Sequence, residues 1–145
     1  MNAPIDPRFA ERIGASFARQ KAMALIGASL GLVAPGLVEI VLPFRDDLTQ
    51  QKGYVHGGII GMIADSAAGY AAYTLMPADC TLVTTEYKIN LLAAASSGLV
   101  ARGEVVKAGR TLTVARAEVY ADDRTHIATM QQTLMMLPGR SDLRE

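Results

Sequence analysis

A carboxylate, a histidine and two glycines lie close together in one apolar stretch of the chain. His56, Gly57 and Gly58 precede residues 59–76, in which Asp65 is the single charged residue. A carboxylate on a buried helix is costly unless it is paired or used in chemistry, as a general base or a nucleophile. The glycines stand where the helix would begin. Backbone N–H groups there lack partners and can bind an anion or a developing oxyanion.

The spacing between Gly57 and Asp65 limits how these groups could act together. Asp65 follows Gly57 by eight residues, which corresponds to about 12 Å along a helix axis. Two groups of one chain cannot hold the same substrate atom across that distance. A shared site requires a second copy of the helix, running antiparallel to the first. The spacing therefore predicts a dimer.

The rest of the chain must place this helix in a core. We expect a short amphipathic helix, a hairpin around Pro35 and Gly36, the long helix ending before Pro77, and then four strands. The expected ranges are 8–22 for the first helix, 25–33 and 37–44 for the hairpin, and 81–91, 99–107, 111–120 and 126–137 for the four strands. One long apolar helix among about six strands favours an α+β domain, with a curved antiparallel sheet wrapped around the helix.

The residues around the glycines also carry a family resemblance. The pattern Gln50-x-x-Gly53-x-x-His56-Gly57-Gly58, followed by Asp65, resembles the signature of PaaI-like acyl-CoA thioesterases of the hotdog fold. The similarity runs from about residue 22 to residue 137. It implies the same sheet and helix, and two chains whose sheets join and whose long helices lie antiparallel. It also implies hydrolysis of acyl-CoA to a free acid and coenzyme A without a metal or redox cofactor, by a homodimer that assembles further into a homotetramer.

The resemblance implies a role for each residue of the motif. Asp65 would activate water or attack the thioester directly, and the Gly57 N–H would polarise the thioester carbonyl. His56 and Gln50 would orient the reacting groups, although His56 could instead serve only to cap the helix. Many relatives have asparagine where this chain has Gln50, so a longer amide would have to fill that role. Ser66, beside Asp65, is a weaker alternative because no base adjoins it in the sequence.

A second group of residues is expected to complete the site. Thr84 or Thr85 occupies the position at which relatives carry a hydroxyl that reaches the attacking water, and both also suit a plain strand. Gly58 is a further substrate-binding candidate whose alternative role is structural. Lys107 and Arg110 flank a turn and would bind the coenzyme A phosphates, with Lys88 and Arg102 as further candidates. Taken singly, each of these charges could equally be a solvated surface group.

Composition narrows the classes of function. The 145 residues carry no net charge and no basic run, which argues against a nucleic-acid partner. We expect one domain over residues 1–145, with loose termini at 1–7 and 139–145. The single Cys80 rules out an internal disulfide and favours a reducing, cytoplasmic location. Asp65 interrupts residues 59–76, which suits a protein core better than a membrane.

Two other functions are compatible with the same fold. A hydratase or dehydratase of acyl thioesters would commonly need a catalytic histidine paired with an acid in a different motif. A non-catalytic acyl-CoA-binding sensor would commonly carry a DNA-binding segment, for which the first 22 residues are too few. A sensor also has no need of a costly carboxylate at Asp65. The sequence leaves the acyl group open.

Overall fold

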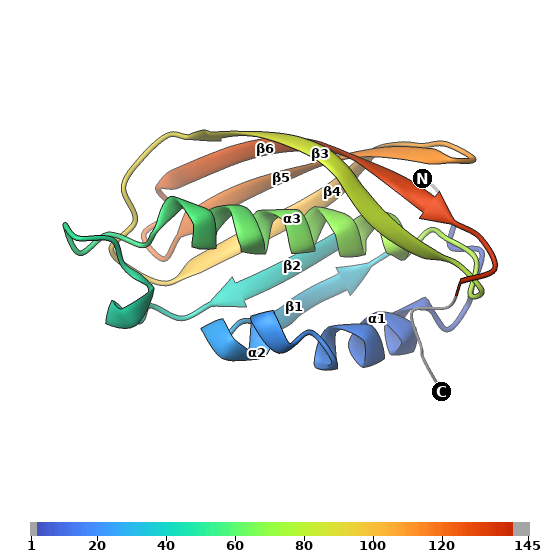
Figure 1. Cartoon of the computed structure of the whole chain (residues 1–145), viewed down its shortest axis with the longest axis horizontal. Coiled ribbons are helices and arrows are strands. Elements are labelled where there is room, and N and C mark those ends of the chain that lie inside the picture. Colours follow the sequence, from blue (N-terminus) through green and yellow to red (C-terminus); the bar gives the residue numbers. More distant parts are fainter. Residues whose placement is uncertain (1–2, 141–145) are drawn as a thin grey trace.

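The long helix α3 (Gly57–Tyr73) lies against one face of a six-stranded sheet in the computed structural model, which describes residues 3–140 (Figure 1). The strands are β1 (Ser29–Ala34), β2 (Leu37–Leu42), β3 (Thr81–Leu91), β4 (Leu99–Ala108), β5 (Leu112–Ala121) and β6 (His126–Leu137). Two short helices, α1 (Phe9–Ala18) and α2 (Lys21–Ile26), precede the sheet, and a 3-10 helix, η1 (Asp46–Leu48), lies between β2 and α3. The predicted sheet around one long helix is confirmed.

The order of the strands leaves β3 at one edge of the sheet. The order is β1-β2-β4-β5-β6-β3, and all neighbouring strands are antiparallel. β3 pairs with β6 over its whole length, whereas no strand of residues 3–140 pairs with its other side. A long unpaired edge presents a row of backbone donors and acceptors to which another chain can pair.

Small residues on both surfaces let α3 approach the sheet closely. Ala64, Ala67, Ala68 and Ala71 of α3 are fully buried. A side chain at Gly103 of β4 would place its Cβ 2.2 Å from the backbone of Ala67, so only glycine fits there. This contact fixes the position of the helix along the sheet, and thereby decides which helix residues lie beside β3.

The N-terminal region differs from the prediction in two places. The single helix expected over residues 8–22 is two helices, α1 and α2, separated by an extended Gln20. The strand expected over residues 25–33 begins only at Ser29, because α2 continues to Ile26 and ends at Gly27. Gly27 has a φ of 78°, the left-handed conformation that commonly ends helices. A short apolar run does not by itself distinguish a helix from a strand, which explains the error.

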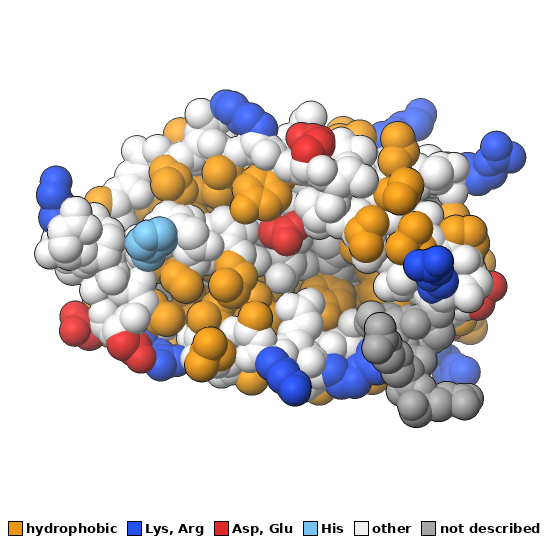
Figure 2. Space-filling model, viewed as in Figure 1, with side chains coloured by type: hydrophobic (Ala, Val, Ile, Leu, Met, Phe, Trp, Pro, Cys, Tyr) orange, Lys and Arg blue, Asp and Glu red, His pale blue; other side chains and the backbone are white. Residues whose placement is uncertain are grey.

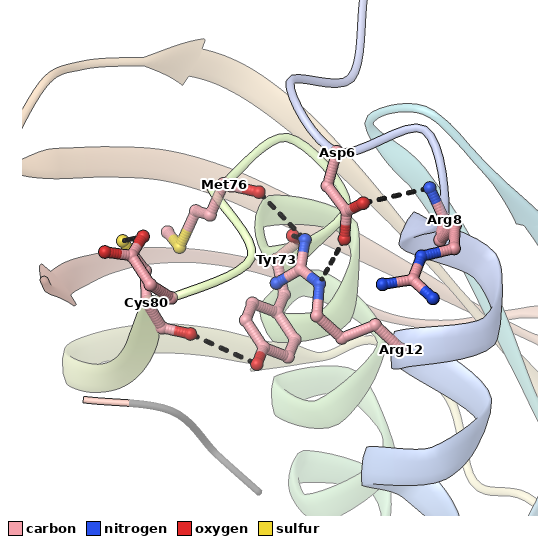
Figure 3. Close-up of polar contacts among 7 residues, drawn as sticks. Asp6, Arg8, Arg12, Tyr73, Met76 and Cys80 are labelled. Atoms are coloured by element: carbon pink, nitrogen blue, oxygen red, sulfur yellow. Dashed lines mark hydrogen bonds and ion pairs between the residues drawn. The ribbon is translucent and has the colours of Figure 1, made fainter. Parts of the chain in front are cut away.

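A buried arginine joins α1 to the end of α3 (Figure 3). The Nη2 of Arg12 donates to the carbonyl oxygens of Tyr73 at 3.2 Å and Met76 at 2.8 Å. Its guanidinium carbon lies 4.2 Å from the centre of the Tyr73 ring, and its Nε pairs with Asp6 at 3.0 Å. The loose start expected over residues 1–7 is therefore wrong for Asp6, which the ion pair holds against α1.

The second half of the chain follows the prediction closely. β3 and β6 have the expected ends, and β4 and β5 differ from the expected ranges by one residue. Residues 1–2 and 141–145 of the expected loose termini lie outside the described residues. Among residues 3–140, no helix has the length and apolar character needed to span a membrane.

Candidate active site

Asp65 lies in the middle of α3 and is held by two side chains from the sheet. The hydroxyl of Thr84 on β3 donates to Asp65 Oδ1 at 2.7 Å. Nε2 of Gln132 on β6 donates to the Asp65 backbone carbonyl at 3.3 Å. Burial raises the pKa of the Asp65 carboxyl above its ordinary value, and hydrogen bonding by Thr84 and Gln132 opposes that rise. The result is a carboxylate that binds a proton more readily than an exposed aspartate does.

The two neighbouring threonines of β3 point to different partners, and one of them reaches Asp65. The pairing of β3 with β6 shifts register between Thr84 and Glu86. Up to Thr84 the strand pairs in regular register, and successive side chains of a strand point to opposite faces. Thr84 faces α3, whereas the Thr85 hydroxyl donates to the backbone carbonyl of Thr133 at 3.0 Å. Of the two threonines that the sequence left open, Thr84 is therefore the one beside the carboxylate.

A pocket of about 210 Å³ opens beside Asp65, between α3, β3 and the N-terminal helices. Asp65 is the one charged residue in its lining. The pocket is lined by Ser16, Gln20, Asp65, Ser66, Gly69, Tyr70, Tyr73, Thr81, Leu82 and Thr84. The five lining residues on α3 recur at helical spacing, so one face of the helix forms one wall of the pocket.

The start of α3 presents a free backbone donor. His56 precedes the helix in an extended conformation, and its Nδ1 accepts a hydrogen bond from the Gly58 N–H at 2.8 Å. This cap places the imidazole proton on Nε2 in the neutral ring. Within residues 3–140 no acceptor is bonded to the Gly57 N–H. Of the two glycine donors, Gly57 is therefore the one available to a ligand.

Gly57 and Gln50 share a second pocket, of about 360 Å³. Leu91, at the end of β3, lies over Gly57. The Gln50 side-chain oxygen accepts a hydrogen bond from the Lys52 N–H. This bond holds the Gln50 amide against the turn that follows it in the chain. Neither Asp65 nor Thr84 lines this pocket.

The predicted site residues thus form two separate groups within one chain. Asp65 and Thr84 line the first pocket, and Gln50 and Gly57 line the second. The eight-residue spacing along α3 keeps the two groups about 12 Å apart along the helix axis. One chain alone therefore does not bring the carboxylate to the free N–H.

The basic residues expected to bind coenzyme A lie elsewhere. Lys107 and Arg110 are exposed at the turn between β4 and β5, and they line neither pocket. This turn lies at the end of α3 that is opposite Gly57 (Figure 1). Arg102 forms an ion pair with Glu39 at 2.6 Å. The described residues contain no cluster of three or more His, Cys, Asp or Glu side chains able to hold a metal ion.

Sequence reasoning missed several residues around Asp65. Gln132 is fully buried on the face of β6 that also carries Met130 and Leu134. A single amide in an otherwise apolar row was the available signal. Ser16, Gln20 and Tyr70 were also missed, because nothing in the sequence indicates that the first helices adjoin the same pocket.

Comparison with known proteins places this geometry in a family. The family model described as the thioesterase superfamily matches residues 52–128, more than half of the chain. The chain belongs to the thioesterase superfamily. A thioesterase family protein from Silicibacter pomeroyi has a solved structure with 47% sequence identity and a TM-score of 0.87, covering 90% of this chain and 99% of that one. As a member of this superfamily, the chain is a thioester hydrolase.

Two more distant similarities agree with that assignment. The PaaI protein from the E. coli phenylacetic acid degradation operon is 16% identical, with a TM-score of 0.86 over 92% of this chain and 96% of that one, a likeness in fold. A proposed esterase of Halobacterium salinarum is 28% identical over 102 residues, which are 67% of this chain and 68% of that protein. The predicted resemblance to hotdog thioesterases of the PaaI type is confirmed.

Proposed function

We infer that this thioesterase hydrolyses acyl-CoA to a free carboxylic acid and coenzyme A, at a site formed by two chains. The observation that carries the proposal is the hydrogen-bonded pair of Asp65 and Thr84 in a pocket beside the central helix. Neither a hydratase nor a sensor gains support from the three relatives described above, which are named as a thioesterase family protein, PaaI and an esterase.

The reaction follows from the two groups of residues. Asp65 accepts a proton from a water molecule, and the resulting hydroxide adds to the thioester carbonyl carbon. The Gly57 N–H of the second chain stabilises the negative charge on the carbonyl oxygen of the tetrahedral intermediate. The carbon–sulfur bond then breaks, and the leaving thiolate takes up the proton from Asp65. Water and a carboxylate suffice for these steps, so the proposal includes no metal or redox cofactor.

Supporting residues have defined parts in this scheme. Thr84 fixes one carboxylate oxygen, which leaves the other to face water. His56 caps the helix and so keeps Gly58 occupied and Gly57 free. Gln50 lines the second pocket together with Gly57, and we assign its amide to a contact with the thioester there. We assign Lys107 and Arg110 to the binding of coenzyme A, because their positive charges would attract its phosphates.

The division of the site between two pockets supports a homodimer as the active unit. β3 has an unpaired edge within the described residues. On its helix-facing side, Tyr87 is 46% exposed and Leu91 is 54% exposed. Figure 2 shows hydrophobic side chains gathered on this face of the molecule. A second chain with its own α3 antiparallel to the first would cover these residues and bring its Gly57 toward Asp65.

Release of free coenzyme A thiol from a panel of acyl-CoA esters tests the activity. The native chain and the Asp65→Asn variant are compared, because asparagine keeps the shape and removes the base. We expect turnover on at least one ester and a loss of about 10²–10⁴-fold in the variant, the usual contribution of general base catalysis. Tight binding of acyl-CoA with no turnover by the native chain would contradict the proposal.

Mixing two inactive variants tests the shared site. A dimer of one Asp65→Asn chain and one Gly57→Pro chain contains one site with both defects and one site with neither, if each site uses both chains. Co-expression with two different affinity tags isolates this mixed dimer. We expect it to recover about half of the native activity. No recovery would show that Asp65 and Gly57 act within the same chain.

The homotetramer and the cytoplasmic location stay predictions. Light scattering after size-exclusion chromatography distinguishes a dimer from a tetramer at working concentration. Fractionation of cells that express the native protein tests the location.

A further inference from the structure

Backbone hydrogen bonding at the end of β3 shows which residues turn their peptide groups to the open edge. The N–H of Leu92, one residue past the strand, donates to the carbonyl oxygen of Ile127 on β6 at 2.8 Å. Peptide groups alternate in direction along a regular strand, so those of Leu91, Ile89 and Tyr87 point away from β6. Within residues 3–140 no strand occupies that side. Tyr87 therefore offers an N–H and a C=O to a strand of another chain.

The shared site fixes where the two-fold axis of the dimer passes α3. If Gly57 of each chain meets Asp65 of the other, the antiparallel helices cross the axis at the residue midway between them. That residue is Gly61, which has no side chain to hold the two helices apart. The phenol oxygen of Tyr87 lies 3.5 Å from the point at which a Cβ on Gly61 would lie. Tyr87 is therefore the residue of β3 at the level of the axis.

The charges on either side of Tyr87 complement each other across such an axis. Glu86 and Lys88 are exposed, and both point away from α3 because they flank a residue that faces it. Antiparallel pairing centred on Tyr87 places Glu86 opposite Lys88 of the second chain, and the same pair recurs beyond the axis. Opposite charges at directly opposed positions stabilise an antiparallel pair. Both charges thus favour a second copy of this chain as the partner.

Neighbouring registers lack this complementarity. Pairing centred one residue away opposes Glu86 to its own copy, or Lys88 to its own copy, and like charges directly opposite are destabilising. Within residues 3–140 Lys88 bonds the neutral side chain of Asn90, and neither charge has an ion-pair partner. Both charges are therefore available to select one register.

We propose that two chains join through β3 with Tyr87 at the two-fold axis, and that reciprocal ion pairs between Glu86 and Lys88 select this register. The proposal rests on the two-chain site inferred above and names the residues that align it. A shift of the centre by one residue moves one strand about 7 Å along the other. Such a slip would carry Gly57 of the second chain away from Asp65. The edge of the sheet thus sets the geometry of a site on the helix.

Two charge-reversed chains test the ion pairs directly. Glu86→Lys leaves two positive charges beside Tyr87, and Lys88→Glu leaves two negative charges. In the proposed register each variant repels its own copies and attracts the other, so co-expression should favour mixed dimers. We expect the ratio of mixed to self-paired dimers to exceed the statistical ratio about tenfold, since each mixed dimer gains two attractive charge pairs. Native mass spectrometry of chains with tags of different mass measures this ratio.

Glu104→Arg and Arg116→Glu form the matched control. These side chains pair at 2.8 Å across β4 and β5 within one chain, so their reversal should leave the statistical ratio. The same ratio in both experiments would overturn the proposal. Dimer composition is the readout because Lys88 is also a candidate for binding coenzyme A. Statistical mixing by a chain that hydrolyses thioesters would therefore leave the thioesterase function standing, whereas preferential mixing without hydrolysis would support the register and overturn the function.

Cysteine cross-linking tests the register independently. Tyr87→Cys places its two copies about 5.5 Å apart between Cα atoms, a distance that a disulfide bridges. Asn90→Cys is the matched control, because its two copies lie six strand positions apart, or about 20 Å. The native Cys80 is buried and should form no link. We expect covalent dimers from Tyr87→Cys alone after mild oxidation, and their absence, or their formation by Asn90→Cys instead, would overturn the register.

Discussion

The hydroxyl of Thr84 on β3 donates a 2.7 Å hydrogen bond to Oδ1 of Asp65 in the middle of α3. This bond joins the edge strand to the central helix at the one charged position of the pocket. It favours the ionised carboxylate, whereas burial favours the protonated form. The balance between the two sets the pH range in which Asp65 can act as a base.

Replacing Thr84 by valine should therefore shift the pH dependence of activity. Valine keeps the shape and removes the donor, so the pKa of Asp65 rises further and the acidic limb of the kcat/KM profile moves to higher pH. We expect kcat/KM at neutral pH to fall about tenfold, since a hydrogen bond to a charged group is lost. Thr85→Val is the control, because the Thr85 hydroxyl bonds a strand carbonyl. Equal pH profiles for the two variants would contradict the assignment.

Gly57 offers a direct test of the free N–H. Proline is favoured at the first position of a helix, and His56 already has the extended backbone that a following proline requires. Gly57→Pro removes the N–H, whereas Gly57→Ala keeps it; both variants displace the flexible end of Leu91. We expect kcat for the proline variant to be about 10²–10³-fold below that of the alanine variant. Equal rates would exclude this N–H from the reaction.

Asp65→Asn should stabilise the fold while it removes activity. The pKa of Asp65 is raised in the folded chain, so the folded state binds this proton more tightly than the unfolded state. At pH values above the raised pKa of the folded chain, the ionised Asp65 carboxylate therefore destabilises the fold. This destabilisation disappears as the pH falls from the raised pKa to the ordinary pKa of an aspartate in the unfolded chain. We expect Tm to rise by about 3 °C at neutral pH.

The stability gained by Asp65→Asn should also become smaller as the pH is lowered, because Asp65 in the native chain becomes protonated and neutral at low pH. Thermal melts at several pH values measure the difference between native and variant. Asp46→Asn, at an exposed position in η1, serves as the control and should leave Tm unchanged. A lower Tm for Asp65→Asn across the pH range would show that the carboxylate is a structural group.

Arg12→Met should destabilise the chain strongly. Arg12 is buried and donates to two carbonyl groups at the end of α3, so its loss removes one donor from each carbonyl and the ion-pair partner of the Asp6 carboxylate. We expect a loss of about 3 kcal/mol in the free energy of unfolding, measured by denaturant titration. Arg45→Met is the matched control, because the Arg45 side chain is 41% exposed and should cost less than about 1 kcal/mol. Similar losses in the two variants would contradict the special role of Arg12.

Local patterns in the sequence determined most of the fold. The alternation within residues 81–91 and 126–137 predicted β3 and β6 with their observed ends. The apolar run with one charge predicted α3, because its length and small residues suit a buried helix. The pattern was ambiguous at residues 25–26, where an unbroken apolar run fits a strand as well as a helix.

The sequence also determined which residue types are available for chemistry. Asp65 stood out as a lone charge in an apolar stretch, and the spacing from Gly57 showed that the two could not act on one atom within a chain. Both inferences need only helix geometry and the cost of burying a charge. They hold before any strand is placed.

Tertiary structure alone decided which distant side chains meet. Thr84 rather than Thr85 faces Asp65 because of the register in which β3 pairs with β6. The same strand pair brings the buried Gln132 to the backbone of Asp65. Ser16 reaches Tyr70 only because α1 packs against α3. The two residues in each of these contacts are separated by between 19 and 67 positions in the sequence. Register and packing of whole elements set them, and no local pattern in a single sequence records that information.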